Sequence, residues 1–190
     1  MTHGLLLAKS NDHDFPRLIR ELEDRQIYCE HPLVLPALIT EFVIDECSER
    51  VNLSNLTLNN LEESMGQHKY MNRPRGNPLE LDFIATTRDI NVESRRLGLC
   101  TARLRGVLLA LELILSETEK TLMQSNLRPI KSEATTSLPA APDGFCIMDD
   151  MIANLVNSCK NTLARVEYET KRTQTLISVV GISQSDLARG

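Results

Sequence analysis

The apolar and polar positions of this chain follow one spacing over two long stretches. In each stretch an apolar or small residue recurs alternately four and three residues after the last one. This average period of about 3.5 residues predicts long α-helices, each with a narrow seam that faces partner helices as in a coiled coil. The first seam comprises Phe83, Thr87, Ile90, Ser94, Leu97, Thr101, Leu104, Leu108, Leu111, Leu115, Thr118 and Leu122, and the second comprises Ile152, Val156, Cys159, Leu163, Val166, Thr170, Thr173, Ile177 and Val180.

Breaks in this pattern predict how the 190 residues are organised. Gly, Pro and Asn concentrate at 66–78, and Pro, Ser, Thr and Ala concentrate at 127–145, so both segments are predicted loops and the second is flexible. The sequence predicts one helical domain over 1–190. Its parts are a partly flexible N-terminus at 1–31, shorter helices at 32–65, and a long helix pair at 79–125 and 146–184.

Prolines and glycines refine the predicted helix ends. Pro32 suits a first turn, but Pro36 predicts that the regular helix begins nearer residue 36. The asparagine-rich stretch that follows predicts a weak helix, with a strand at 56–58 as the alternative. Asn77-Pro78 is a start signal for the first long helix. Gly98 and Gly106 lie inside that helix, where each permits the close approach of another helix or marks a bend.

The predicted fold is all-α: an elongated bundle built on a long antiparallel helical hairpin, with the shorter N-terminal helices packed on it. The loop at 127–145 is long enough for the two long helices to fold back on each other. Polar seam residues such as Thr87, Ser94 and Thr170 weaken a two-stranded coiled coil and leave room for further helices. A bundle of three or more helices therefore fits better than an isolated pair.

Composition and charge narrow the class of protein. Aromatic residues make up only 4% of the chain and Trp is absent, which suits thin helix–helix seams. The net charge of −5 argues against nucleic acid or an anionic membrane as the main partner. No apolar run approaches the ~20 residues that cross a bilayer. Five cysteines without a CxxC pair indicate reduced structural thiols, and therefore a cytoplasmic location.

The sequence offers little that resembles catalytic chemistry. No phosphate-binding glycine loop, GxSxG or HExxH motif is present, so neither an enzyme nor a cofactor is expected. Arg88, Arg95, Arg96, Arg103 and Arg105 alternate with acidic residues, which predicts ion-paired flanks of a coiled coil. Acidic residues also gather on the second predicted helix. As speculative surface contacts for Mg²⁺ we single out Glu41, Asp45, Glu46 and Glu49, and the alternative is a simple solvated face.

Three segments resemble one family, the fungal proteins described as CorA-like magnesium transporters. The first is HPLVLP at 31–36 with Glu41 after it, and the second is LDF at 81–83 with TR at 87–88 and IN at 90–91. The third runs from Tyr168 to Asp186, with KRTQ, ISVV and QSD in order. The resemblance implies the cytoplasmic helical region that precedes the membrane part of such a transporter. In that family a stalk helix and two transmembrane helices with a Gly-Met-Asn signature follow.

Two hypotheses of function result. The first is a non-enzymatic cytoplasmic domain of a CorA-like Mg²⁺ transporter that acts in assembly, with sensing of Mg²⁺ as a regulatory ion an open extension. The family's ion-conducting residues match no position here and are not carried over. The second is a coiled-coil module for protein–protein interaction with no role in transport. Either hypothesis predicts a homo-oligomer or a helical protein partner.

Overall fold

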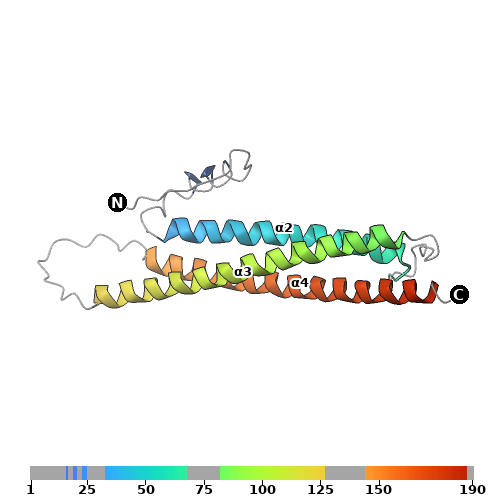
Figure 1. The fold of residues 1–190 in the computed structure, drawn as a ribbon. Helices are drawn as coiled ribbons and strands as arrows, with labels where there is room; N and C mark the ends of the chain where they lie inside the picture. The colour runs from blue at the N-terminus through green and yellow to red at the C-terminus, as the bar shows by residue number, and fades with distance from the viewer. Residues whose placement is uncertain are drawn as a thin grey trace, which may run out of the picture. The chain divides into compact units, whose positions relative to one another are not determined.

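A computed structural model describes residues 33–67, 82–126 and 144–187, together with five residues of the N-terminal segment. Across these ranges the chain forms three long helices and no strand (Figure 1). They are α2 (Val34–Ser64), α3 (Phe83–Asn126) and α4 (Gly144–Leu187). The predicted all-α class is confirmed. The predictions for 1–31, 68–78 and 127–143 fall almost wholly outside the described residues, apart from Pro16, Ile19, Arg20, Glu23 and Asp24.

The chain divides into two compact units, and each helix contributes to both. Unit 1 contains Met1–Ile44 and Gly106–Cys159, and unit 2 contains Asp45–Arg105 and Lys160–Gly190. Each unit thus holds a part of α2, a part of α3 and a part of α4. The contacts that carry the functional argument below all lie within unit 2.

Side-chain contacts fix the helix directions inside unit 2. Ser54 on α2 donates a hydrogen bond to Glu93 on α3. Cys47 lies one heptad before Ser54, and Cys100, which interacts with it, lies one heptad after Glu93. Because the partner number falls on α3 as it rises on α2, these two helices are antiparallel. Arg165 and Arg172 on α4 contact residues of α2 whose numbers rise together with theirs. Helix α4 therefore runs parallel to α2 and antiparallel to α3, the direction predicted for the long pair.

Helix α2 is a single helix of 31 residues rather than two shorter ones. It begins at Val34, because Pro36 falls in the first turn, where a missing N–H costs no helical hydrogen bond. The strand considered at 56–58 is wrong: these residues are helical, and Leu58 is fully buried in the core. Gly66, with φ of 68°, follows the end of the helix in the left-handed conformation that glycine adopts at little cost.

Helix α3 begins at Phe83, four residues later than predicted, because Asp82 caps it. One carboxylate oxygen of Asp82 accepts hydrogen bonds of 3.0 Å from the backbone N–H groups of Ile84 and Ala85. These two donors have no partner within the helix, and a side-chain acceptor satisfies them. The start signal proposed at Asn77-Pro78 lies outside the described residues. Helix α4 agrees with its predicted bounds to within three residues at each end.

The cap gives a first testable prediction. Replacing Asp82 with alanine should lower the free energy of unfolding by about 1 kcal/mol, because two backbone donors lose their acceptor. Asp82→Asn should retain most of the stability, since an asparagine oxygen accepts the same bonds. Chemical denaturation followed by circular dichroism measures both variants. Equal stability of the alanine variant and the parent would contradict this role of Asp82.

The predicted seams form the core. On α3, Ile90, Leu97 and Leu104 are fully buried, and on α4 Val166 and Thr173 are too. Every member whose exposure the structure describes is buried or half-buried except Ile177, which is 39% exposed. The buried stripe is wider than the prediction, because each helix of a three-helix bundle packs against two neighbours. The additional buried positions are Thr86, Glu93, Cys100, Val107 and Ile114 on α3, and Leu155, Thr162, Glu169 and Leu176 on α4.

All three helices meet in one hydrophobic cluster in unit 2. Its buried members are Leu58, Met65, Ile90, Leu176 and Val180. Because α2, α3 and α4 each contribute to it, this cluster holds the outward faces of the helices in fixed orientations.

Candidate functional site

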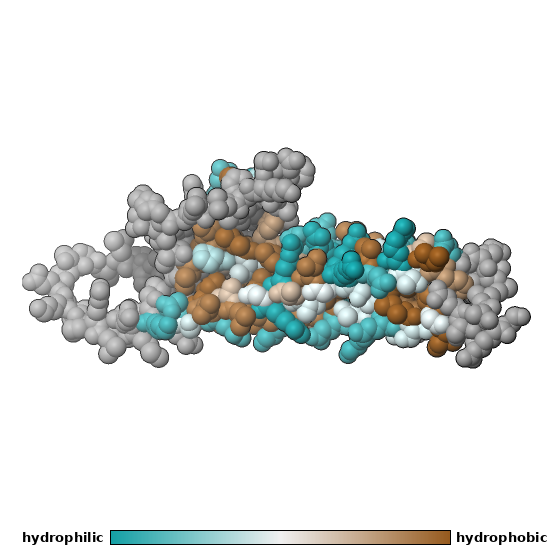
Figure 2. Space-filling model, viewed as in Figure 1, coloured by the Kyte–Doolittle hydropathy of each residue, from teal (hydrophilic) through white to brown (hydrophobic). Residues whose placement is uncertain are grey.

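One face of α3 in unit 2 exposes large apolar side chains. Ile84 is 82% exposed and Leu99 is 65% exposed, with Val92 between them. Arg88 and Arg95 alternate with these three residues at spacings of four, four, three and four, so all five lie on one side of the helix. We call these five residues the α3 outer face. Figure 2 shows that apolar side chains reach the surface of the described part of the molecule between polar ones.

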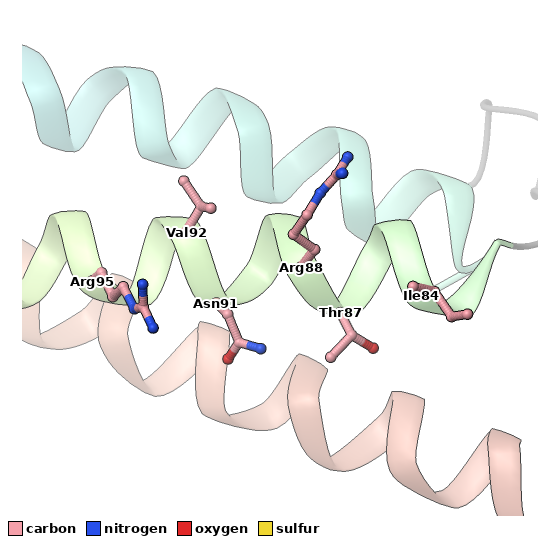
Figure 3. A pocket seen from close by; sticks show the side chains of 6 residues that line it. All are labelled: Ile84, Thr87, Arg88, Asn91, Val92 and Arg95. Atoms are coloured by element: carbon pink, nitrogen blue, oxygen red, sulfur yellow. The ribbon is translucent and has the colours of Figure 1, made fainter.

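A shallow hollow of about 500 Å³ lies on this face (Figure 3). In the close view, Arg88 and Val92 lie on one side of the axis of α3, whereas Thr87 and Asn91 point to the other. The hydroxyl of Thr87 is already used, since it donates a 2.7 Å hydrogen bond to the carbonyl of Phe83. The residues that line the hollow are Ile84, Thr87, Arg88, Asn91, Val92 and Arg95.

The two arginines give this hollow positive charge. Arg88 has an acidic neighbour in Asp89, but the closest atoms are 3.6 Å apart and both side chains are largely exposed. Such an exposed pair contributes little. Arg95 makes no ion pair or hydrogen bond among the residues that the structure describes. The face thus offers apolar contact and two guanidinium groups suited to carboxylates. Its lining contains one hydroxyl, that of Thr87, and no His, Asp, Glu, Lys, Cys or Tyr that could act as a general base.

Among the described residues, the backbone beside Leu99 has open space around it. Gly98 lies next to Leu99, and a Cβ atom added to Gly98 would meet nothing within 4 Å. The same is true of Gly106. Each glycine in a helix interior costs up to about 1 kcal/mol relative to alanine. Within the described chain, neither glycine is required for the close approach of a helix, which the sequence offered as one reason for their presence.

The flanking arginines of α3 divide into two groups. Arg96 pairs with Glu93 at 2.6 Å and Arg103 pairs with Glu46 at 3.0 Å, as predicted for flanks of a coiled coil. Arg95 departs from that pattern. Glu93 is also unusual, since its side chain is only 3% exposed and accepts a 2.7 Å hydrogen bond from Ser54. Alternation of charges alone did not distinguish the paired arginines from the others.

The four predicted Mg²⁺ contacts all lie on α2. Glu41 is half-buried and belongs to unit 1, whereas Asp45 and Glu49 are exposed in unit 2. No group of three or more His, Cys, Asp or Glu side chains that could hold a metal occurs among the described residues. Hard cations such as Mg²⁺ need several converging oxygen ligands. The proposed Mg²⁺ contacts therefore rest on the sequence alone.

The remaining residue of this set, Glu46, already has cationic partners. It accepts hydrogen bonds from Arg50 at 2.7 Å and from Arg103 at 3.0 Å. Burial would raise the pKa of this carboxyl, but the hydrogen bonds and positive charges of the two arginines outweigh it and lower the pKa. Glu46 thus remains ionised and joins α2 to α3.

A repeated arginine contact joins α2 and α4. Arg165 donates hydrogen bonds to Ser48 and Asn52. One heptad later, Arg172 donates to the corresponding residues, Asn55 at 2.9 Å and Asn59 at 2.8 Å. The sequence carried this signal as two arginines seven residues apart on α4 and an asparagine-rich stretch on α2.

The second arginine also neutralises two carboxylates. Arg172 pairs with Glu62 at 2.9 Å and with Glu169 at 2.8 Å, and the side chain of Glu169 is only 7% exposed. Burial would lower the pKa of Arg172, but the two carboxylates outweigh it and raise the pKa. The guanidinium also lies 6.0 Å from the centre of the exposed Tyr168 ring. These contacts are built into the bundle and stabilise it.

A pair of thiols lies between α2 and α3. Cys47 and Cys100 are 0% and 2% exposed, and the pairing of α2 with α3 places them opposite each other. Hydrogen bonding between the two thiols lowers the pKa of Cys100 against the opposing effect of burial, and together with burial it raises the pKa of Cys47. Cys159 is also buried, and burial raises its pKa. The structure describes no side chain for Cys29 or Cys146.

Comparison with known proteins places the chain in no family. No family model matches it, and neither a curated protein nor a solved structure does. The resemblance to CorA-like proteins therefore stays a prediction from three segments of sequence. In the described part of the chain, no helix has an apolar stretch long enough to cross a membrane.

Proposed function

We propose that this chain is a non-enzymatic helical domain that assembles with further copies of itself through the α3 outer face. The observation that carries the proposal is the alternation of exposed apolar residues with arginines on that face, including Arg95, which has no partner in the described chain. Exposed apolar side chains that gather on one face of a folded domain and are flanked by polar ones are typical of an interaction site. An occupant of this face has to offer both apolar side chains and carboxylates.

A surface of α2 in the same chain has these properties. Leu53 is 58% exposed and Leu56 is 60% exposed, and Glu49 is exposed one turn before them. We call these three residues the α2 outer face. Its leucines complement Val92 and Leu99, and its carboxylate complements the arginines, so α2 of a second copy fits as the occupant. Helix-on-helix docking of this kind places apolar anchors at the centre and charged residues at the rim.

Contact between two α3 outer faces is less favourable. It would bring Arg88 and Arg95 of one copy towards the same residues of the other, and like charges across an interface are costly. A contact of α3 with α2 joins different surfaces of the two copies, and it is either reciprocal across a two-fold axis or heterologous. Heterologous contacts build rings when the rotation closes and open chains when it does not. The expected product is thus a two-fold dimer if the contact is reciprocal and a larger oligomer if it is heterologous.

Assembly of this kind agrees with the leading hypothesis from the sequence. We propose that the chain corresponds to the cytoplasmic helical region of a CorA-like divalent-cation transporter, and that Mg²⁺ regulates it. The support consists of the three similar segments at 31–41, 81–91 and 168–186. A module that binds another helical protein, with no role in transport, is the alternative. The α3 outer face supports this alternative equally well, since it would receive an acidic amphipathic helix from any source.

Sedimentation velocity at several protein concentrations tests the assembly. Arg95→Glu should weaken association at least about tenfold, because it places a carboxylate opposite Glu49. The charge-swapped double variant Arg95→Glu with Glu49→Arg should regain much of the loss. Arg105→Glu is the matched control, since it reverses another exposed arginine of α3 outside this face. A strictly monomeric parent at high concentration would contradict assembly, and oligomers that ignore Arg95→Glu would contradict the surface.

The same samples test regulation by Mg²⁺. An ion that binds only the folded state raises the thermal midpoint, and one that favours the oligomer shifts the sedimentation profile. Glu49→Gln should abolish either effect if the exposed carboxylates of α2 hold the ion. If millimolar Mg²⁺ produces neither effect, ion sensing is removed from the proposal, whereas the proposed assembly is not affected.

A further inference from the structure

The thiols of Cys47 and Cys100 are held together by the register of α2 and α3. Cys47 lies one heptad before Ser54, and Cys100 lies one heptad after Glu93, and the Ser54–Glu93 hydrogen bond is 2.7 Å long. On the other side, Glu46, the residue before Cys47, pairs with Arg103 at 3.0 Å. Polar contacts on both sides thus fix the two helices so that the cysteines face each other in the same core layer.

Two arginines and the Glu46 carboxylate that pairs with both of them lie beside these thiols. Arg103 lies three residues after Cys100 on α3, and Arg50 lies three residues after Cys47 on α2. The hydrogen bond with Cys47 is the largest effect that lowers the pKa of Cys100, and both guanidinium groups lower it too, against burial and the Glu46 carboxylate. A thiolate with a second thiol in contact is the arrangement of a redox-sensitive cysteine with its resolving partner.

We propose that Cys47 and Cys100 are a redox-active dithiol, which a peroxide converts into a disulfide that links α2 to α3. The Cys100 thiolate attacks one oxygen of hydrogen peroxide, the O–O bond breaks, and the departing hydroxide takes a proton to become water. The sulfenic acid on Cys100 is then attacked by the sulfur of Cys47. The S–O bond breaks, and the released hydroxide leaves as water with the proton of Cys47. Two thiols lose two electrons, and one peroxide yields two waters.

Burial determines how this site reacts. Both thiols are almost inaccessible, so a small oxidant such as hydrogen peroxide reaches them better than a bulky disulfide. The product connects two residues that are far apart in the sequence, and it restricts the unfolded chain more than the folded one. The oxidised protein is therefore expected to be more stable than the reduced protein, with its helices in the same places. This inference is independent of the proposed assembly.

Peptide mapping of the oxidised full-length chain tests the inference. Trypsin leaves Cys29 and Cys47 on one peptide, 26–50, and Cys100 on another, 97–103. The experiment therefore uses Cys29→Ala, in which a link between these peptides requires Cys47. Treatment with hydrogen peroxide should yield the linked peptides, which a thiol reductant separates again. The thermal midpoint should rise by about 5–10 °C on oxidation.

Two controls define the outcomes. Adding Cys47→Ala should abolish both the linked peptides and the rise in the midpoint, whereas adding Cys159→Ala should leave the linked peptides in place. Alkylation after denaturation counts the thiols that did not react. Recovery of both alkylated peptides after peroxide, further oxidation of Cys100 to a sulfinic acid, or linkage between two chains would each overturn the inference. The assembly experiment does not affect these readouts, because it measures a surface on the other side of α3.

Discussion

Replacing Arg172 with methionine is expected to lower the free energy of unfolding by about 3–5 kcal/mol. Arg172 is 15% exposed and neutralises Glu169, which is 7% exposed, and Glu62, which is 25% exposed. Without the guanidinium, Glu169 would remain inside the bundle as a charge without its cation. Removing one partner of a buried pair costs more than the pair contributes, because the other partner keeps its desolvation penalty.

Urea denaturation followed by circular dichroism measures this loss. Arg165→Met is the matched control, since Arg165 makes the equivalent contacts one heptad earlier but is exposed and faces no carboxylate in those contacts. The Arg165→Met variant should lose about 1 kcal/mol or less of its free energy of unfolding. Adding Glu169→Gln to Arg172→Met should recover part of the stability by removing the stranded charge. Equal losses for the two arginine variants would show that Glu169 is not the reason for the cost.

Leu97→Ala is expected to lower the free energy of unfolding by about 2–5 kcal/mol. Leu97 is fully buried at the centre of the α3 seam, between the fully buried Ile90 and Leu104. Truncation removes three carbon atoms from the core, and the surrounding helices cannot move closer without disturbing those two neighbours. The cost therefore includes the lost transfer energy and the cavity that remains.

Leu99→Ala provides the contrast on the same helix. Leu99 is 65% exposed, so its truncation should change the free energy of unfolding by no more than about 0.5 kcal/mol. Sedimentation of folded samples should give the opposite order of effects. Leu99→Ala should weaken association, whereas Leu97→Ala should not. Similar stability losses for the two leucines would contradict the orientation of α3.

The helices could be predicted because burial repeats along them. The seam residues of α3 were identified from spacing alone, and those that the structure describes are buried or half-buried. The outer rows of the core could not be predicted in this way, because they include Glu93, Glu169 and Thr162. Polar residues at these positions look solvent-exposed in a hydropathy pattern. The two carboxylates are buried with partners, since Glu93 contacts Ser54 and Arg96 and Glu169 contacts Arg172.

The candidate site was harder to predict than the fold. The α3 outer face interleaves Ile84, Val92 and Leu99 with arginines, and this mixture resembles the charged flank of a coiled coil. Only the positions of the partners separate Arg96, which is paired, from Arg95, which is not paired in the described chain. The acidic residues of α2 were visible in the sequence. Their division into Glu46, which arginines occupy, and Glu49, which remains exposed, required the structure.

The repeated arginine contacts between α2 and α4 also affect how firmly the two parallel helices are held against sliding. If α4 moved back along α2 by one heptad, about 10 Å, Arg172 would reach Ser48 and Asn52 and regain hydrogen bonds like those it has now. The sliding would nevertheless cost the ion pair with Glu62, because the residue one heptad earlier is the neutral Asn55. The ion pair with Glu62 thus favours the native register over the one shifted by a heptad.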